Sequence, residues 1–241
     1  MERDEYRRIA GAETSHWWYG TTRDLLRQVL GPRLRRGGTF LDAGCGPGAT
    51  GAWMAAHGRV VGVDYEPLAL ELYAETRPEA TLAAASVTAL PFADGSFDAV
   101  LCVTVLYHEA VSDPAAAVAE LGRVLRPGGT LCLMEPGIRR LRRAHDRVTH
   151  TARRFSRHDL HRLTTDAGLR CDRATGAYLF LVPPAAAKAV VEHGRTDSDL
   201  DTSPGGMGGA LTRLAAAERR LIGRRDLPTG LSVLAVATRP D

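Results

Sequence analysis

Two acidic residues, each at the end of an apolar stretch, bracket a glycine-rich loop in this chain of 241 residues. Asp42 precedes the run Ala43-Gly44-Cys45-Gly46-Pro47-Gly48, and Asp64 ends the next apolar stretch, twenty residues after Gly44. Glycines let a ligand approach backbone amides closely, and an acid at the end of the second strand can accept hydrogen bonds from both hydroxyls of a ribose. The pattern predicts an adenosyl group held across the ends of two neighbouring parallel strands.

The glycine-rich loop by itself leaves two classes of cofactor open. Residues 46–51 match the GxGxxG pattern of dinucleotide-binding proteins, which is a weak signal when it stands alone. Asp42, directly before the loop, suits the ammonium group of an amino-acid tail and is unfavourable beside a pyrophosphate. We therefore expect an adenosyl amino acid, and a nicotinamide-dependent oxidoreductase is the alternative.

Strand-forming and helix-forming segments alternate along most of the chain. Strands are expected over 39–42, 59–64, 80–85, 97–103, 130–135, 169–175 and 231–238, and helices over 3–13, 21–36, 49–57, 67–77, 113–125, 156–167 and 210–223. This alternation predicts an α/β fold in which helices cover both faces of a parallel sheet. We divide the chain into an N-terminal helical lid over 1–37, a core over 38–175, an insertion that caps the substrate over 176–229, and a final core strand over 230–241.

Several motifs follow one another in order between residues 38 and 136. They are Leu41 to Gly48, Val61-Gly62-Val63-Asp64, Ala89-Leu90-Pro91-Phe92 with Gly95-Ser96-Phe97-Asp98, and Arg123-Val124-Leu125-Arg126-Pro127-Gly128-Gly129. As a set they resemble the motifs of class I S-adenosylmethionine-dependent methyltransferases, in the small-molecule, type 11-like branch related to quinone-biosynthesis enzymes. The resemblance implies a Rossmann-like, seven-stranded, mostly parallel sheet whose last strand is antiparallel. It also implies S-adenosyl-L-methionine as cofactor and S-adenosyl-L-homocysteine as product.

The same resemblance implies a set of cofactor-binding residues. They are Asp42, Gly44 and Gly46 at the methionine end, Asp64 on the ribose, and Ser86 and Val87 beside the adenine. Further candidates for cofactor binding are Cys45, Tyr65, Val103, Trp18 and Arg23. Relatives often carry an aspartate where this chain has Ser86. A hydroxyl can still accept a hydrogen bond from the adenine amino group, but it is neutral, so we expect somewhat weaker adenine recognition.

The resemblance also implies that the loop after the fourth expected strand, residues 105–109, faces the methyl group. His108 is therefore the first candidate for a general base or for a residue that orients the substrate. Tyr107 is the second catalytic candidate. The structural alternatives are a His108 that caps a helix or packs against the cofactor, and a Tyr107 that packs in the core.

An aromatic cluster lies near the N-terminus, at Ser15-His16-Trp17-Trp18-Tyr19. It resembles the His-Trp-Trp-Tyr element of a bacterial methyltransferase subgroup. Tryptophan can shield a sulfonium by cation–π contact or cover a flat substrate, so we interpret the element as a lid over the cofactor, with His16 and Tyr19 on the substrate. A hydrophobic anchor for the N-terminal helix is an equally good interpretation.

Eight arginines fall within residues 139–157. They are Arg139, Arg140, Arg142, Arg143, Arg147, Arg153, Arg154 and Arg157. They follow the fifth expected strand, where Arg139 is a candidate for contacts with an acidic substrate. A solvated helix face is the alternative. Glu135, at the end of that strand, is a candidate either for a contact with the substrate or for a buried pair with an arginine. His158 and His161 lack a third ligand at helical spacing, so no metal site is expected.

The bulk composition narrows the class of protein. A net charge of +3 is too small to indicate that the protein binds nucleic acid. Four widely spaced cysteines, Cys45, Cys102, Cys132 and Cys171, indicate a reducing compartment, and no apolar run is long enough to span a membrane. We therefore expect a cytoplasmic protein.

The sequence thus predicts methyl transfer to an oxygen or nitrogen atom of a small molecule, with an acidic acceptor as one option. Besides the nicotinamide enzyme, the alternatives are a scaffold role and non-methylating chemistry on the same cofactor. The oligomeric state stays open between a monomer and a homodimer.

Overall fold

A single seven-stranded sheet organises the chain, whose computed structural model describes residues 3–141, 145–191 and 208–241. Its strands are β1 (Gly38–Ala43), β2 (Gly58–Asp64), β3 (Thr81–Ala84), β4 (Phe97–Val103), β5 (Leu125–Pro136), β6 (Arg170–Ala177) and β7 (Ser232–Thr238). They lie in the order β3-β2-β1-β4-β5-β7-β6, and β7 runs antiparallel to both of its neighbours. The predicted fold class, with an antiparallel last strand, is confirmed.

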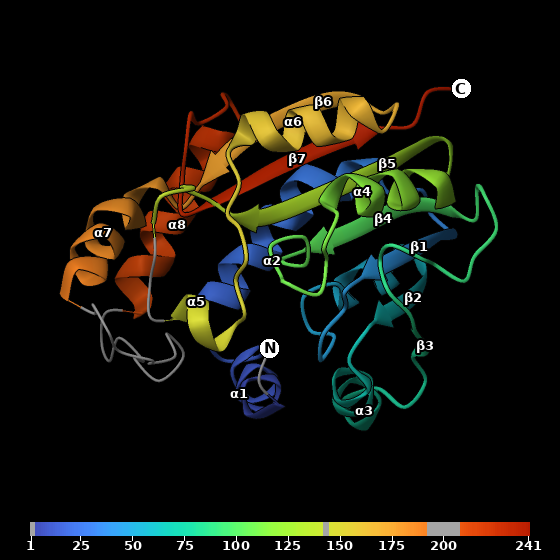
Figure 1. Ribbon diagram of the computed structural model, residues 1–241, viewed down its shortest axis with the longest axis horizontal. Coiled ribbons are helices and arrows are strands. Elements are labelled where there is room, and N and C mark those ends of the chain that lie inside the picture. Colours follow the sequence, from blue (N-terminus) through green and yellow to red (C-terminus); the bar gives the residue numbers. More distant parts are fainter. Residues whose placement is uncertain (1–2, 142–144, 192–207) are drawn as a thin grey trace.

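Alternate residues of the central strands pack into two separate hydrophobic layers. One face, which includes Val100 and Leu131, packs against α4 (Pro114–Val124) and α6 (Arg157–Asp166). The other face, which includes Leu101 and Cys132, packs against α2 (Trp17–Leu30) and α8 (Gly208–Ile222). Figure 1 shows α4 and α6 on the near side of the sheet and α2 behind it. Because both faces are covered, the central strands consist of continuous apolar runs.

The N-terminal segment contributes to the core as well as to the site. α2 begins at Trp17, four residues earlier than predicted, because the Nδ1 atom of His16 accepts the Trp18 N–H at 3.3 Å and caps the helix. Leu26 and Leu30 on this helix are fully buried against the sheet. α1 (Arg3–Ala12) instead lies beside α3 (Pro67–Thr76), at the edge of the sheet that carries β2 and β3. Of the segment interpreted as a lid, much of α2 therefore belongs to the core.

The segment after the glycine-rich loop differs from the predicted helix over 49–57. It forms a short 3₁₀ helix, η2 (Ala52–Ala56), and residues 49–51 form a turn. Gly51 packs closely on the Asp42 carboxylate, where an added Cβ would lie 2.0 Å from Oδ2. The close approach of this backbone to Asp42 leaves no room for a side chain there.

The segment between β6 and β7 adds helices beside α2. It contains η3 (Leu179–Leu181), α7 (Val182–Val191) and α8, and Gln28 of α2 donates to the Arg219 carbonyl of α8 at 3.0 Å. The polar stretch 196–199 and the glycine pair 205–206, which we placed in the insertion, lie outside the described residues. Within the described part of the chain, none of the helices has the length and apolar character needed to cross a bilayer.

The burial of α2 predicts a large cost for truncating its apolar face. Leu26→Ala should lower the free energy of unfolding by about 2–5 kcal/mol, because a fully buried leucine loses both its transfer free energy and its packing. Asp24→Ala, on the exposed face of the same helix, should change it by about 0.5 kcal/mol or less. Urea unfolding of both variants measures the difference, and equal effects would contradict the placement of α2 in the core.

Candidate functional site

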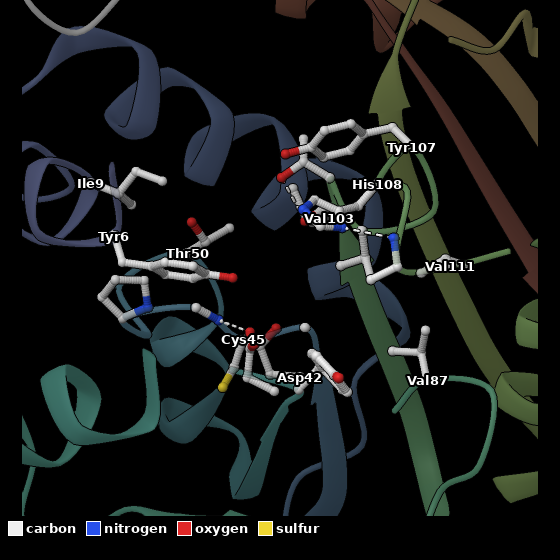
Figure 2. A pocket seen from close by; sticks show the side chains of 18 of the residues that line it. Tyr6, Ile9, Asp42, Cys45, Thr50, Val87, Val103, Tyr107, His108 and Val111 are labelled. Carbon is white, nitrogen blue, oxygen red and sulfur yellow. Dashed lines mark hydrogen bonds between the residues drawn. The ribbon is translucent and has the colours of Figure 1, made fainter. Parts of the chain in front are cut away.

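A cavity of about 170 Å³ opens at the carboxyl ends of β1, β2 and β4. Figure 2 shows Tyr6 and Ile9 on one side, Val103, Tyr107, His108 and Val111 on the other, and Asp42 and Cys45 between them. The sequence-predicted residues that line it are Asp42, Gly44, Cys45, Gly46, Asp64, Tyr65, Ser86, Val87, Val103, Tyr107, His108 and Tyr19. The sheet thus brings most of the predicted site together around one space.

Asp42 supplies a buried carboxylate oxygen whose hydrogen bonding is incomplete. Its Oδ2 atom is shielded from solvent and has no hydrogen-bond partner within the described part of the chain. Burial, helped by the nearby Glu13 and Asp64 carboxylates, raises the pKa of Asp42 to about 8. An orphaned acceptor in an acidic cavity calls for a cationic donor, and an ammonium group meets that need.

Asp64 holds the glycine-rich loop in shape. Its Oδ2 accepts the Gly46 N–H at 2.9 Å, and its Oδ1 accepts the Glu66 N–H at 2.9 Å. Burial raises the pKa of Asp64, although these N–H groups act in the opposite direction. Gly46 has a positive φ of 54°, and a Cβ built on it would meet no atom within 4 Å. The backbone at Gly46 therefore leaves open space beside a fixed carboxylate.

Three lining residues that the sequence analysis missed come from the N-terminal segment. Tyr6, Ile9 and Glu13 all line the cavity, and the hydroxyl of Tyr6 points into it (Figure 2). Their spacing of three and four residues was the available signal, since it places side chains on one face of a helix. Glu13 accepts the Ala49 N–H at 3.0 Å and the Thr50 hydroxyl at 3.3 Å, which ties α1 to the turn after the glycine-rich loop.

His108 lies in the β4 loop, which we define as residues 104–111. Its Nδ1 atom accepts the Ala110 N–H at 3.0 Å, so in the neutral ring the proton is on Nε2. Burial lowers the pKa of His108 to about 4, and the His150 ring acts in the same direction. The two imidazole rings stack at 5.9 Å with an interplanar angle of 4°. A neutral ring with Nδ1 already engaged favours donation from Nε2 over service as a base.

Tyr107, the other catalytic candidate, is almost fully buried beside His108. Burial raises its pKa above the ordinary tyrosine value, with the Glu135 carboxylate acting in the same direction. The phenol therefore stays protonated at neutral pH. It can exclude water or donate a hydrogen bond, but it is a poor proton acceptor in this state.

His16, Trp18 and Arg23 do not belong to the cavity lining. His16 caps α2, and Trp18 packs on the ring of Tyr178 with centroids 4.2 Å apart. Arg23 donates to the Glu13 carbonyl at 2.7 Å and so contacts the cavity wall from behind. Between the two interpretations of the aromatic element, the surroundings of Trp18 favour the anchor, whereas Tyr19 lies at the cavity.

Glu135 and Arg139 also lie outside the cavity lining. Glu135 is fully buried and accepts hydrogen bonds from backbone N–H groups of the β4 loop. Arg139 is exposed and pairs with Asp159 at 3.0 Å.

Other arginines of the 139–157 stretch have internal partners as well. Arg154 pairs with Asp146, and Arg153 donates to carbonyl groups of the β4 loop. Arg142 and Arg143 lie outside the described residues. Among the residues that line the described cavity there is no arginine or lysine, so the described lining offers an acidic acceptor no cationic partner of that type.

Known proteins match both the motifs and the fold. Residues 41–133 match a family model described as a methyltransferase domain. A demethylmenaquinone methyltransferase of Renibacterium salmoninarum is 36% identical over 128 residues, which cover 48% of this chain and 53% of the relative. A ubiquinone biosynthesis O-methyltransferase of Alkalilimnicola ehrlichii is 38% identical over 113 residues, 44% of each chain. The matched regions span about half of these curated relatives.

Residues 41–133 of this chain thus resemble a methyltransferase domain. Solved structures agree on the fold of the domain. The methyltransferase chain of a complex with the Haloferax volcanii Trm112 methyltransferase activator superposes with a TM-score of 0.63 at 24% identity, covering 98% of both chains. Phosphoethanolamine N-methyltransferase 2 of Haemonchus contortus, solved with S-adenosyl-L-methionine, gives 0.60 at 18% identity, covering 92% of this chain and 53% of that one.

The raised pKa of Asp42 predicts how stability depends on pH. A carboxyl with a pKa of about 8 in the folded state and about 3.9 in the unfolded state binds more protons when folded between these values. Its contribution to stability is complete below the unfolded pKa and is lost as the pH rises through the folded pKa. Urea unfolding at pH 6 and pH 9 gives the free energy of unfolding of wild type and of Asp42→Asn. From pH 6 to pH 9, this free energy should fall more for wild type than for the variant. Parallel pH profiles would contradict the assignment.

Proposed function

We propose that this protein transfers the methyl group of S-adenosyl-L-methionine to an oxygen or nitrogen atom of a small molecule. The observation that carries the proposal is the orphaned Oδ2 atom of Asp42, buried beside Asp64 at one end of the sheet. A ligand with a positive amino-acid tail and a ribose satisfies both carboxylates at once. A pyrophosphate would face like charges from Asp42, Asp64 and Glu13, which disfavours the nicotinamide alternative.

Each end of the cofactor has residues of suitable chemistry. Asp42 would bind the ammonium group, and the free lone pairs of Asp64 would accept the ribose hydroxyls. Ser86 and Val87, which line the same cavity, would contact the adenine. The Ser86 hydroxyl is already within 2.8 Å of the Thr88 hydroxyl, so Thr88 can hold it in place as an acceptor.

When bound, the cofactor supplies an electrophilic methyl group on a good, neutral leaving group. The chain must then align the acceptor and keep the site dry. The Nε2–H of His108 is suited to donate a hydrogen bond that orients the acceptor atom. Tyr107, almost fully buried next to it, excludes water from the same end of the cavity.

The lining residues also favour a class of acceptor. Val105, Ala110 and Val111 give the His108 end of the cavity an apolar wall. This wall suits an uncharged acceptor better than the acidic one suggested by the arginine stretch. The relatives that are named for menaquinone and ubiquinone methylation support a small organic acceptor.

Calorimetric titration tests the cofactor. Wild type should bind S-adenosyl-L-homocysteine in the micromolar range and should not bind NADH comparably. The binding should release protons at pH 7, because Asp42 with a pKa of about 8 must ionise to pair with the ammonium. The heat should therefore depend on the ionisation enthalpy of the buffer, and Asp42→Asn should abolish this dependence and weaken binding by about tenfold or more. Tighter binding of NADH than of S-adenosyl-L-homocysteine would contradict the proposal.

Methyl transfer itself can be followed with an acceptor of unknown structure. The protein is incubated with cofactor carrying a carbon-labelled methyl group and a small-molecule extract, and NMR identifies the atom that receives the label. We expect the label on oxygen or nitrogen, because His108 lies where it can orient such an atom. Asp42→Asn serves as the control that should form little product, and label found on carbon alone would contradict the assignment of the acceptor atom.

A further inference from the structure

The β4 loop, which carries Tyr107 and His108, is held by two charged side chains that do not line the cavity. We infer that Glu135 and Arg153 are positioning residues that fix this loop in the geometry that presents His108 to the cavity. The link to catalysis rests on the proposed function. The positioning itself concerns the ligand-free protein and can be tested separately.

Glu135 acts as an internal hydrogen-bond acceptor for the start of the β4 loop. Its Oε1 accepts the N–H groups of Val105 at 3.1 Å and Leu106 at 2.9 Å, and its Oε2 accepts that of Tyr107 at 3.1 Å. Thr104, just before them, has a φ of 54°, which is a strained conformation for a threonine. The turn at Thr104 allows three successive N–H groups to converge on one carboxylate. Such a conformation persists only where its surroundings hold it.

Arg153 binds the same loop through backbone carbonyl groups, whereas Glu135 binds backbone N–H groups. Its guanidinium donates to the Leu106 carbonyl at 3.0 Å and also to the Val111 carbonyl, so it spans the loop. The neighbouring backbone continues this contact, since Ala152 N–H donates to the Tyr107 carbonyl at 3.0 Å. The N–H group of Leu106 thus donates to the Glu135 carboxyl group, and the Leu106 carbonyl accepts from the Arg153 guanidinium.

The two charged groups enclose the segment that carries the candidate catalytic residues. Burial raises the pKa of Glu135, whereas the three N–H groups and the charge of Arg153 favour its ionised form. Leaving a buried hydrogen-bonding group without its partner is costly, so Glu135 and Arg153 resist displacement of the loop. Tyr107 and His108 therefore depend on Glu135 and Arg153 for their placement.

The titration of His108 reports the position of the loop, because the half-buried ring accepts the Ala110 N–H at Nδ1 and has His150 and Glu109 nearby. The experiment is an NMR titration of nitrogen-labelled histidine rings in the ligand-free chain, assigned with His108→Gln. In Glu135→Gln and Arg153→Leu, the pKa of His108 should rise from about 4 by one unit or more, toward its ordinary value of about 6.5. Arg153→Lys, which keeps the charge and the donors, should titrate like wild type.

Arg154→Leu is the matched control, because the Arg154 side chain is also buried but has other partners. It donates to the Gly137 carbonyl and pairs with Asp146, and neither residue belongs to the β4 loop. It should leave the His108 titration unchanged even where it lowers the melting temperature. The inference is overturned if folded Arg153→Leu titrates like wild type, or if Arg154→Leu shifts His108 equally. If Glu135→Gln does not fold, the three arginine variants still decide the matter. Binding of S-adenosyl-L-homocysteine is measured in parallel, so loss of the proposed function would be seen independently.

Discussion

The burial of like charges at one end of the sheet is the constraint on which the site depends. Asp42 and Asp64 end adjacent parallel strands, so the fold forces their carboxylates into one cavity, and Glu13 adds a third. Burial raises the pKa of each of these groups, and for Asp42 the Glu13 and Asp64 carboxylates act in the same direction. Such an arrangement is unfavourable for the protein alone. It becomes favourable when a cation enters, which couples the folding of the site to the ligand that it would bind.

A rigid scaffold is needed to maintain this unfavourable grouping. The central strands are buried on both faces, and α2 and α8 close one face while α4 and α6 close the other. On the side that faces the sheet, the glycine-rich loop packs closely against its surroundings. A Cβ on Gly44 would lie 2.2 Å from the Val105 side chain, and one on Gly51 would meet Asp42. The loop is therefore fixed from the sheet side and open only toward the cavity.

The opposite end of the cavity uses buried charge differently. There the Glu135 carboxyl group and the Arg153 guanidinium form hydrogen bonds with backbone groups of the β4 loop. These two side chains therefore hold the backbone in place and do not need a ligand as partner. The arginine-rich stretch, which suggested an anionic substrate, contributes several of its members to internal bonds. The composition of a segment indicates its charge, but its partners depend on what the fold brings next to it.

The sequence by itself determined the sheet, the glycine-rich loop and the pair of acids, because strand alternation and the placement of glycine and aspartate are local properties that tertiary packing preserves. It also located the Tyr107-His108 pair, since that pair directly follows a strongly apolar strand. It could not show that α2 is a core helix, that Glu13 caps the turn after the glycine-rich loop, or that Trp18 packs on Tyr178. Those contacts join residues far apart in the chain, and only the tertiary structure decided them, because distant segments meet according to the surfaces that the whole fold leaves exposed.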